Sequence, residues 1–219
     1  MAIYNAGYLS PIRKKLGNAV GRKWRSLDVL AVYQPFVSNP NTSAQKRVRL
    51  RFGTLATMAM HAANAINLGF EAICKGTKIP QRSMFISKNW GAVIADSDVA
   101  VTIDYTELVF SDGSLAQVDT TGNASFADPL AVTMSYNAET SAGGEFIDKD
   151  DIVYGVVLDT ETGFVYVGTG VRGVADVVVT VPASANGHRV HAYLFAVGAG
   201  VNDMGRVSPS QYMGSGLIS

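Results

Sequence analysis

The chain has 219 residues, of which 47% are hydrophobic and 16% charged, and its formal net charge is zero. This composition is typical of a folded, loop-rich globular protein and excludes an intrinsically disordered chain. No apolar run has the length of a membrane span, and the N-terminal segment lacks the hydrophobic region of a secretory signal, so we expect synthesis in the cytoplasm. The single cysteine, Cys74, excludes an internal disulfide.

The zero net charge conceals a strong asymmetry along the chain. Residues 1–90 hold fourteen Lys and Arg but only two acidic residues, a net charge of +12. Residues 91–219 hold four Lys and Arg against sixteen acidic residues, a net charge of −12. A basic half joined to an acidic half favours a contact within the chain, a head-to-tail contact between copies, or a basic patch that meets nucleic acid.

The first forty residues predict a basic arm followed by a β-hairpin. Residues 9–16 carry three basic side chains and are too short for a stable isolated helix, so we expect an extended arm there. Residues 19–25 and 27–36 are rich in Val, Trp and Tyr and predict two strands joined by a tight turn.

Residues 43–74 predict a long amphipathic helix. Thr42 and Gln45 have the spacing of a capping box at its start. Basic side chains crowd its first two turns, where the helix dipole disfavours cations, so they lower its stability unless an acidic group meets them. Gly69 either interrupts the helix or lets a neighbour pack closely. One face repeats apolar residues at helical spacing, and we expect it to be buried: Val48, Phe52, Leu55, Ala59, Ala62 and Ile66.

The remainder of the chain predicts one more helix and then a series of strands. Pro80 can open a second helix over residues 81–95. From residue 99 the hydrophobic pattern changes to period two, and short polar or glycine-rich turns separate the apolar runs. We expect strands over residues 101–110, 130–136, 151–159, 163–168, 176–182 and 188–198.

The predicted fold class is α+β. Residues 1–97 would form a basic region with an N-terminal arm, a β-hairpin and two helices. Residues 98–219 would form an acidic antiparallel β-sandwich of the immunoglobulin or fibronectin type, because many short strands with short connections are typical of that architecture. The subtype of the sandwich stays open.

Several stretches together resemble a family of uncharacterised proteins from Bacteroidota and from their phages and prophages. The most specific is GNAVGRKW at residues 17–24, similar to the family's Gly-Asn-x-Val-Gly-x-x-Trp, followed by NPNTSAQ at residues 39–45. Residues 108–115, 181–183 and 191–194 resemble later strands of the family. The resemblance implies no activity and no catalytic residue. Residues 11–16 (PIRKKL) depart from the small-residue segment usual there.

No stretch has the chemistry of a catalytic or metal site. His188 and His191 lie three residues apart on a predicted strand and would point to opposite faces, and His61 lies on the predicted helix. The acidic run of residues 148–151 lacks the glycine and terminal glutamate of a calcium loop, which favours a solvated turn. The sequences GSG at 214–216 and GAG at 198–200 lack the helix that a nucleophile elbow or a phosphate loop requires, and the first is expected in a flexible tail. We therefore expect no cofactor, no bound metal and no enzyme activity.

The basic residues of the first half are the candidate contact site. They would neutralise either phosphates, with Trp24 as a stacking surface, or an acidic protein surface such as the C-terminal half of another copy. The sequence thus favours a non-catalytic structural protein that assembles into a homo-oligomer or lattice, as a virion component of a phage (capsid, decoration or tail) or a filament. A DNA- or RNA-binding protein is the alternative. The candidate contact residues are Arg13, Lys14, Lys15, Arg22, Lys23, Trp24, Arg25, Lys46, Arg47, Arg49 and Arg51.

Overall fold

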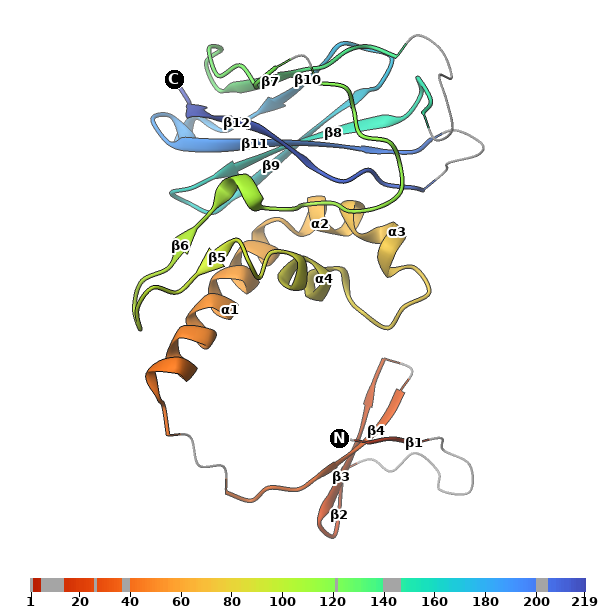
Figure 1. The fold of residues 1–219 in the computed structure, drawn as a ribbon, viewed down its shortest axis with the longest axis vertical. Coiled ribbons are helices and arrows are strands. Elements are labelled where there is room, and N and C mark those ends of the chain that lie inside the picture. The colour runs from red at the N-terminus through yellow and green to blue at the C-terminus, as the bar shows by residue number, and fades with distance from the viewer. Residues whose placement is uncertain are drawn as a thin grey trace. The chain divides into compact units, whose positions relative to one another are not determined.

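The chain forms two compact units, Met1–Thr42 and Ser43–Ser219. The computed structural model, drawn in Figure 1, describes residues 2–4, 14–25, 27–36, 40–120, 122–139, 147–199 and 205–219. Helices and antiparallel sheets coexist, so the predicted α+β class is confirmed. The boundary predicted between residues 97 and 98 falls inside the second unit.

The Met1–Thr42 unit is a small antiparallel sheet with the strand order β1-β4-β3-β2. The predicted hairpin is confirmed, since β3 (Ala19–Trp24) pairs with β4 (Leu27–Val32). On its two sides lie β2 (Lys14–Leu16), which pairs with β3, and β1 (Ala2–Tyr4), which pairs with β4. The residues of β2 belong to the segment that we expected to be an arm; they are ordered as a strand because the edge of the hairpin satisfies their backbone hydrogen bonds.

The predicted long helix begins at the expected residue but is bent into three segments. These are α1 (Ser43–His61), α2 (Ala63–Gly69) and α3 (Glu71–Cys74). Backbone hydrogen bonds from Ala62 to Met58 and from Phe70 to Ile66 continue the helical pattern across both bends. At Gly69, an added Cβ would collide with the backbone carbonyl oxygen of Phe110, so the glycine permits close packing of the helix against that segment. The bends let the helix follow the sheet beneath it.

The second helix, α4 (Gln81–Lys88), starts after Pro80 as expected but ends well before residue 95. The reason is Asn89, a fully buried side chain. Its amide nitrogen donates to the carbonyl oxygens of Phe85 and Val109, and its oxygen accepts from the backbone N–H of Val109. Asn89 thus ends the helix and fastens it to residue 109.

A short hairpin and a 3₁₀ turn occupy the place of the strand predicted over residues 101–110. β5 (Val93–Ile94) pairs with β6 (Thr102–Ile103), and η1 (Tyr105–Glu107) follows. The side chain of Asp104 accepts hydrogen bonds from the backbone N–H and the hydroxyl of Thr106. This local turn competes with strand pairing, so the alternating pattern does not continue as a strand.

The other predicted strands are confirmed, and one more follows them. They form a four-stranded sheet in the order β12-β11-β8-β9 and a two-stranded sheet of β10 and β7, all antiparallel. The segment expected to be a flexible tail is instead β12, paired with β11. The bounds are β7 Ala131–Ser135, β8 Ile152–Asp159, β9 Val165–Val171, β10 Asp176–Thr180, β11 Arg189–Val197 and β12 Gln211–Leu217, with a 3₁₀ turn η2 at Ala183–Ala185.

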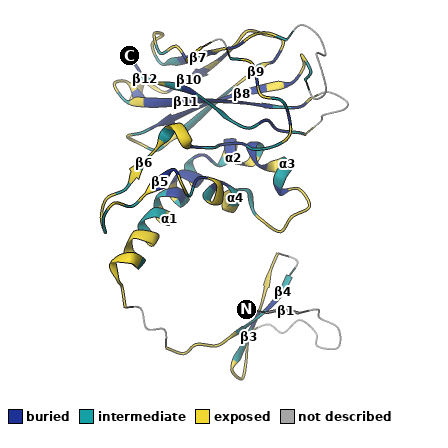
Figure 2. Ribbon diagram, in the orientation of Figure 1, coloured by how far each residue is buried: buried dark blue, intermediate teal, exposed yellow. Residues whose placement is uncertain are grey.

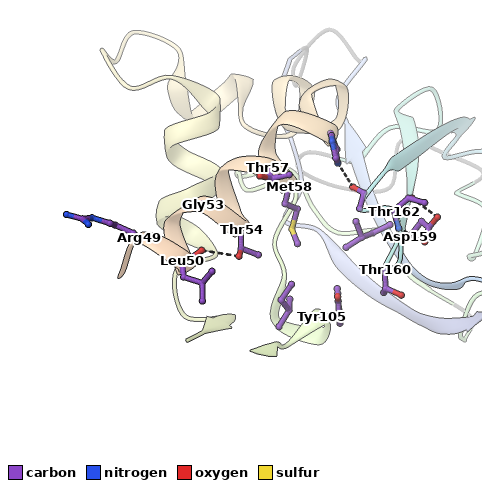
Figure 3. Close-up of a pocket in the computed structure, with 14 residues that line it drawn as sticks. Arg49, Leu50, Gly53, Thr54, Thr57, Met58, Tyr105, Asp159, Thr160 and Thr162 are labelled. Carbon is purple, nitrogen blue, oxygen red and sulfur yellow. Dashed lines mark hydrogen bonds between the residues drawn. The ribbon is translucent and has the colours of Figure 1, made fainter. Parts of the chain in front are cut away.

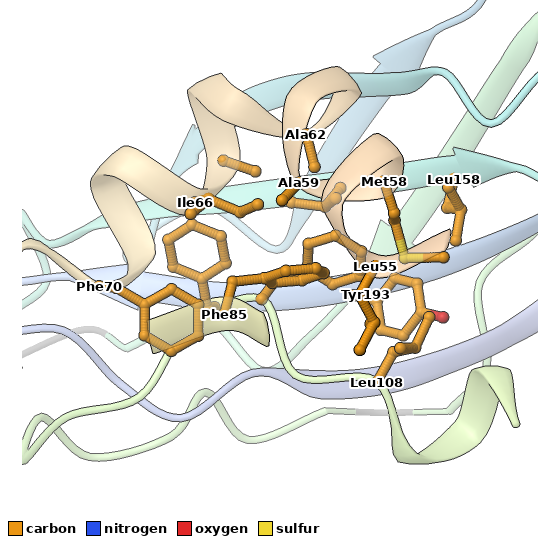
Figure 4. Packing of buried hydrophobic residues seen from close by; sticks show 14 of the residues in the cluster. Leu55, Met58, Ala59, Ala62, Ile66, Phe70, Phe85, Leu108, Leu158 and Tyr193 are labelled. Carbon is orange, nitrogen blue, oxygen red and sulfur yellow. The ribbon is translucent and has the colours of Figure 1, made fainter. Parts of the chain in front are cut away.

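Both faces of the four-stranded sheet are covered, which explains the nearly continuous apolar runs of β8 and β11. Along β8, Val156 and Leu158 face the helices, whereas Val153 and Val157 face the β10-β7 sheet. Figure 4 shows the helical side of this core, where Leu55, Ala59 and Ile66 pack near Phe85 and Tyr193. The Ser43–Ser219 unit is therefore a stack of helices, a four-stranded sheet and a two-stranded sheet.

Among the described residues, no helix combines the length and apolar character that a membrane span requires. The first turns of α1 project away from this stack and are mostly exposed (Figure 2).

Candidate functional site

A groove of about 470 Å³ lies between α1 and the turn that joins β8 to β9. Figure 3 shows how its walls come from elements far apart in the sequence. Gly53 opens space on the helix side, because an added Cβ there would meet nothing within 4 Å. The lining residues are Arg49, Leu50, Gly53, Thr54, Thr57, Met58 and His61 from α1, Ile103 and Tyr105 beyond it, and Leu158, Asp159, Thr160, Thr162 and Gly163 from the turn.

Several polar groups of this groove are held by bonds to the protein itself. The hydroxyl of Thr54 donates to the carbonyl oxygen of Leu50. His61 stacks on Phe164 at a centroid distance of 4.8 Å, and its Nδ1 lies 3.1 Å from the carbonyl oxygen of Gly163. The two contacts of His61 join the end of α1 to the turn, and the groove between them has an apolar wall with a polar rim.

The side chain of Asp159 stabilises the turn between β8 and β9 through hydrogen bonds. Its buried carboxylate accepts from the backbone N–H of Glu161 and the hydroxyl of Thr162, and its Oδ2 lies 2.8 Å from Nδ1 of His188. Burial opposes ionisation of Asp159, but the hydrogen bonds from Thr162 and His188 outweigh it and lower the pKa of its carboxyl group. The same carboxylate raises the pKa of His188 through that hydrogen bond. Asp159 is therefore a structural group of the turn, with its oxygens occupied.

The basic residues of the Met1–Thr42 sheet divide between its two faces. Directly opposed residues share a face, so the pairing of Leu16 with Ala19 and of Ala19 with Val32 places these apolar side chains on one face. Lys14 and Lys23 share this face by the alternation of the strands. We call it the apolar face of the sheet.

The opposite face, which we call the aromatic face, carries Lys15, Arg22 and Trp24. The ammonium group of Lys15 lies 3.8 Å from the centre of the Tyr33 ring. Arg25, in the turn after β3, lies 5.9 Å from the ring of Trp24. The basic run of the sequence is thus two separate groups of cations; Arg13 lies outside the described residues.

Basic residues in the first turns of α1 contact acidic and aromatic side chains. Lys46 and Arg47 reach the carboxylate of Asp98, at 3.9 and 3.4 Å. The guanidinium of Arg51 stacks over Trp90 at 4.3 Å. Asp98 thus supplies an acidic group near the start of this helix, and the side chain of Arg49 extends away from the other lining residues (Figure 3).

A family model matches residues 11–214, nearly the whole chain. The chain belongs to DUF6266, a family of unknown function. This confirms the resemblance to an uncharacterised family. A comparison with curated proteins found no match.

In the DUF6266 chain, His188, just before β11, and His191, within β11, have different structural roles. His188 pairs with Asp159, whereas His191 stacks on Tyr105 at 4.2 Å and has Nδ1 3.0 Å from the hydroxyl of Tyr212. Burial and the nearby Arg189 lower the pKa of His191. Across the described ranges, no three His, Cys, Asp or Glu side chains come together as metal ligands.

The acidic run of residues 148–151 was expected to be a solvated turn, and the structure corrects this for one residue. Asp148 and Asp150 lie in a surface turn, but Asp151 is fully buried and pairs with the buried Arg172 at 3.0 Å. Arg172 also donates to the carbonyl oxygens of Ala116 and Gln117. The sequence contains no local signal that would pair Asp151 with Arg172, twenty-one residues later.

Sequence reasoning also missed the groove and Asn89. The groove depends on the meeting of α1 with a turn a hundred residues later, and a single sequence does not show that contact. The one local signal was the apolar strand followed by Asp159 and two threonines, which predicts a tight turn but not its neighbour.

Proposed function

We propose that this protein is a non-catalytic structural protein that assembles with copies of itself into a homo-oligomer or lattice. The observation that carries the proposal is the exposed apolar surface of the small N-terminal sheet. Leu16, Val32 and Phe36 are 62%, 77% and 92% exposed. A partner surface that covers these apolar side chains would remove them from water and stabilise the sheet.

Charge supports a second copy as that partner. The Met1–Thr42 unit carries six Lys and Arg against one acidic residue, a net charge of +5, and the Ser43–Ser219 unit therefore carries −5. Opposite charges on the two units attract one unit of a chain to the other unit of a neighbour and steer the encounter. We further propose an immunoglobulin- or fibronectin-like type for the paired sheets. The resemblance to proteins of Bacteroidota and their phages supports a virion component, made in the cytoplasm, or a filament.

The test is the mass of the full chain in solution, measured by light scattering after size exclusion. Wild-type protein should form multimers, and replacing Leu16 and Val32 together with Glu should reduce them toward single chains, because both substitutions place charge on the apolar face. Leu217→Glu, at an exposed position of the second unit, is the control and should leave the multimers unchanged. A wild-type mass of one chain at every concentration would contradict the proposal.

Nucleic-acid binding remains the second candidate, because cations and an exposed aromatic ring share the aromatic face. Replacing Lys15 and Arg22 with Gln should then weaken binding to single-stranded DNA or RNA, whereas the Leu16 and Val32 substitutions should not. Binding should also fall steeply between about 50 and 200 mM salt. If no binding is detected at low salt, this second function is excluded.

A further inference from the structure

The apolar face of α1 continues beyond the region that the protein covers. Leu55 and Ala59 are fully buried, and α4 packs against this part of the helix. One and two turns earlier on the same face, Phe52 and Val48 are 51% and 56% exposed. We call these two residues the α1 stripe. The stripe extends a buried apolar face but is itself exposed, which is typical of a surface that binds another apolar surface.

The charge around the stripe is positive. Four basic residues lie within the first three turns of α1, which contain no acidic residue. Asp98, which Lys46 and Arg47 both reach, neutralises only part of this charge. A partner for the stripe should therefore combine exposed apolar side chains with carboxylates.

The Ser43–Ser219 unit carries such a surface at the end of the sheets where β8 begins and β9 ends. Ile152 and Val171 are cross-strand neighbours, and both are exposed. Val174, in the turn after β9, is exposed beside them, and its backbone N–H donates to the carbonyl oxygen of Val171. We call this region the acidic end.

Carboxylates surround these apolar residues. Backbone hydrogen bonds join residue 139 to 172, residue 173 to 149 and residue 136 to 175, so the turns of this end form one surface. Among the described residues of this end, Lys149 is an exposed cation and Arg206, beside the end of β11, is a partly exposed one, whereas Arg172 is buried against Asp151. The carboxylates are Asp119, Glu139, Asp148, Asp150 and Asp176.

The stripe and the acidic end lie far apart on one molecule. The β8–β9 turn touches His61, at the end of α1. Val48 is thirteen residues up the helix from His61, about 20 Å. Ile152 is seven residues along β8 from the turn, about 23 Å. The two surfaces lead away from the turn in different directions (Figure 1).

We propose that the α1 stripe of one copy docks on the acidic end of a second copy, which extends the proposed self-assembly to a specific head-to-tail interface. The apolar groups on the two sides cover one another, and the basic first turns of α1 meet the carboxylates. An α1-to-α1 contact would instead place like charges together, which opposes a symmetric pair. A head-to-tail contact leaves a free stripe at one end and a free acidic end at the other, so it generates rings or filaments.

The experiment uses two full-length variants that each remove one surface. The head variant carries Val48→Asp and Phe52→Asp, and the tail variant carries Val171→Lys and Val174→Lys; all four positions are exposed, so the fold should persist. Each variant alone should form smaller species than the wild type, because it has lost one side of the head-to-tail contact and keeps the apolar face of the N-terminal sheet. Mixed in equal amounts, the two should form larger species than either variant alone, because the intact stripe of the tail variant can dock on the intact acidic end of the head variant.

The matched controls are Met60→Asp on the same helix and Leu217→Lys on β12, both at exposed apolar positions, and both should assemble as the wild type does. Light scattering gives the masses, and circular dichroism checks the fold. If the wild type assembles and either variant does so equally well, this interface is wrong while self-assembly stands. If the mixture forms nothing larger than either variant alone, the interface is also wrong. If the wild type is monomeric, the proposed function fails and the interface with it.

Discussion

At the scale of single residues, Gly69 and Gly53 have the same chemistry on neighbouring helices but opposite surroundings. A Cβ at Gly69 would meet the carbonyl oxygen of Phe110, whereas a Cβ at Gly53 would meet open space. We expect Gly69→Ala to lower the free energy of unfolding by about 1–3 kcal/mol through overpacking. Gly53→Ala should raise it by about 0.5–1 kcal/mol, because alanine is the better helix former. Urea denaturation measures both; a stabilising Gly69→Ala would contradict the packing described.

The buried pair of Arg172 and Asp151 predicts a large effect from a single substitution. Arg172→Ala leaves the carboxylate of Asp151 without its partner in the interior and should cost about 3–5 kcal/mol of unfolding free energy. Replacing both residues with apolar ones, as Arg172→Met and Asp151→Leu, should recover part of that loss. A double variant as unstable as Arg172→Ala would show that the hydrogen bonds of the two side chains to the backbone, from Arg172 to residues 116 and 117 and to Asp151 from residues 148 and 199, matter more than the ion pair.

His188 predicts a pH dependence. The carboxylate of Asp159 raises the pKa of His188 above its usual value of 6.5 in the folded state. Its contribution to stability is therefore complete below pH 6.5 and is lost as the pH rises through the folded-state pKa. The Tm of the wild type should exceed that of His188→Asn most at about pH 6, and the difference should shrink toward about pH 8. An equal difference at both pH values would mean that the charge of His188 contributes nothing.

The residue scale also shows what a single sequence predicts. The start of α1 near Ser43 and the start of α4 after Pro80 follow from local rules, and the structure contains both. The pairing of Arg172 with Asp151 and the two hydrogen bonds between Asn89 and Val109 are contacts between distant segments, which no local rule contains.

At the scale of elements, the apolar face of α1 contains buried and exposed positions, and substitutions at the two should have different effects on stability. Leu55 lies in the core with no exposed surface, so Leu55→Ala should cost about 2–5 kcal/mol. Phe52, one turn away on the same face, is half exposed, and Phe52→Ala should change stability by about 0.5 kcal/mol or less in the isolated chain. Thermal unfolding at low protein concentration measures both. A large loss for Phe52→Ala under those conditions would show that the chain itself covers the stripe.

Element prediction worked where burial on both faces enforces the pattern and failed where local turns compete. β8 and β11 are apolar on both faces and lie where the sequence places them. The alternating residues 101–110 do not form a long strand, because Asp104 bonds to Thr106 and turns the chain. β12 contains two glycines and has weak strand propensity, and only its pairing with β11 makes it a strand. The helical face predicted from Val48 to Ile66 is buried only from Leu55 onward.

At the scale of the whole molecule, the structure shows where the basic and acidic residues of the second unit lie. Within the Ser43–Ser219 unit, four of the twelve Lys and Arg lie on the first turns of α1, and several carboxylates lie at the far end of its sheets. The sequence predicts a basic and an acidic half, but it does not show that exposed apolar groups lie within each charged surface. Only the three-dimensional structure shows that the apolar and charged groups lie together, because this depends on where α4 stops covering α1 and on which strand ends meet.

The most direct test of self-assembly is the sedimentation velocity of the full wild-type chain over a wide range of concentrations, at low and at high salt. We predict species larger than one chain, whose share grows with protein concentration and falls as salt screens the attraction between basic and acidic surfaces. A single species with the mass of one chain at every concentration and in both salts would contradict the account.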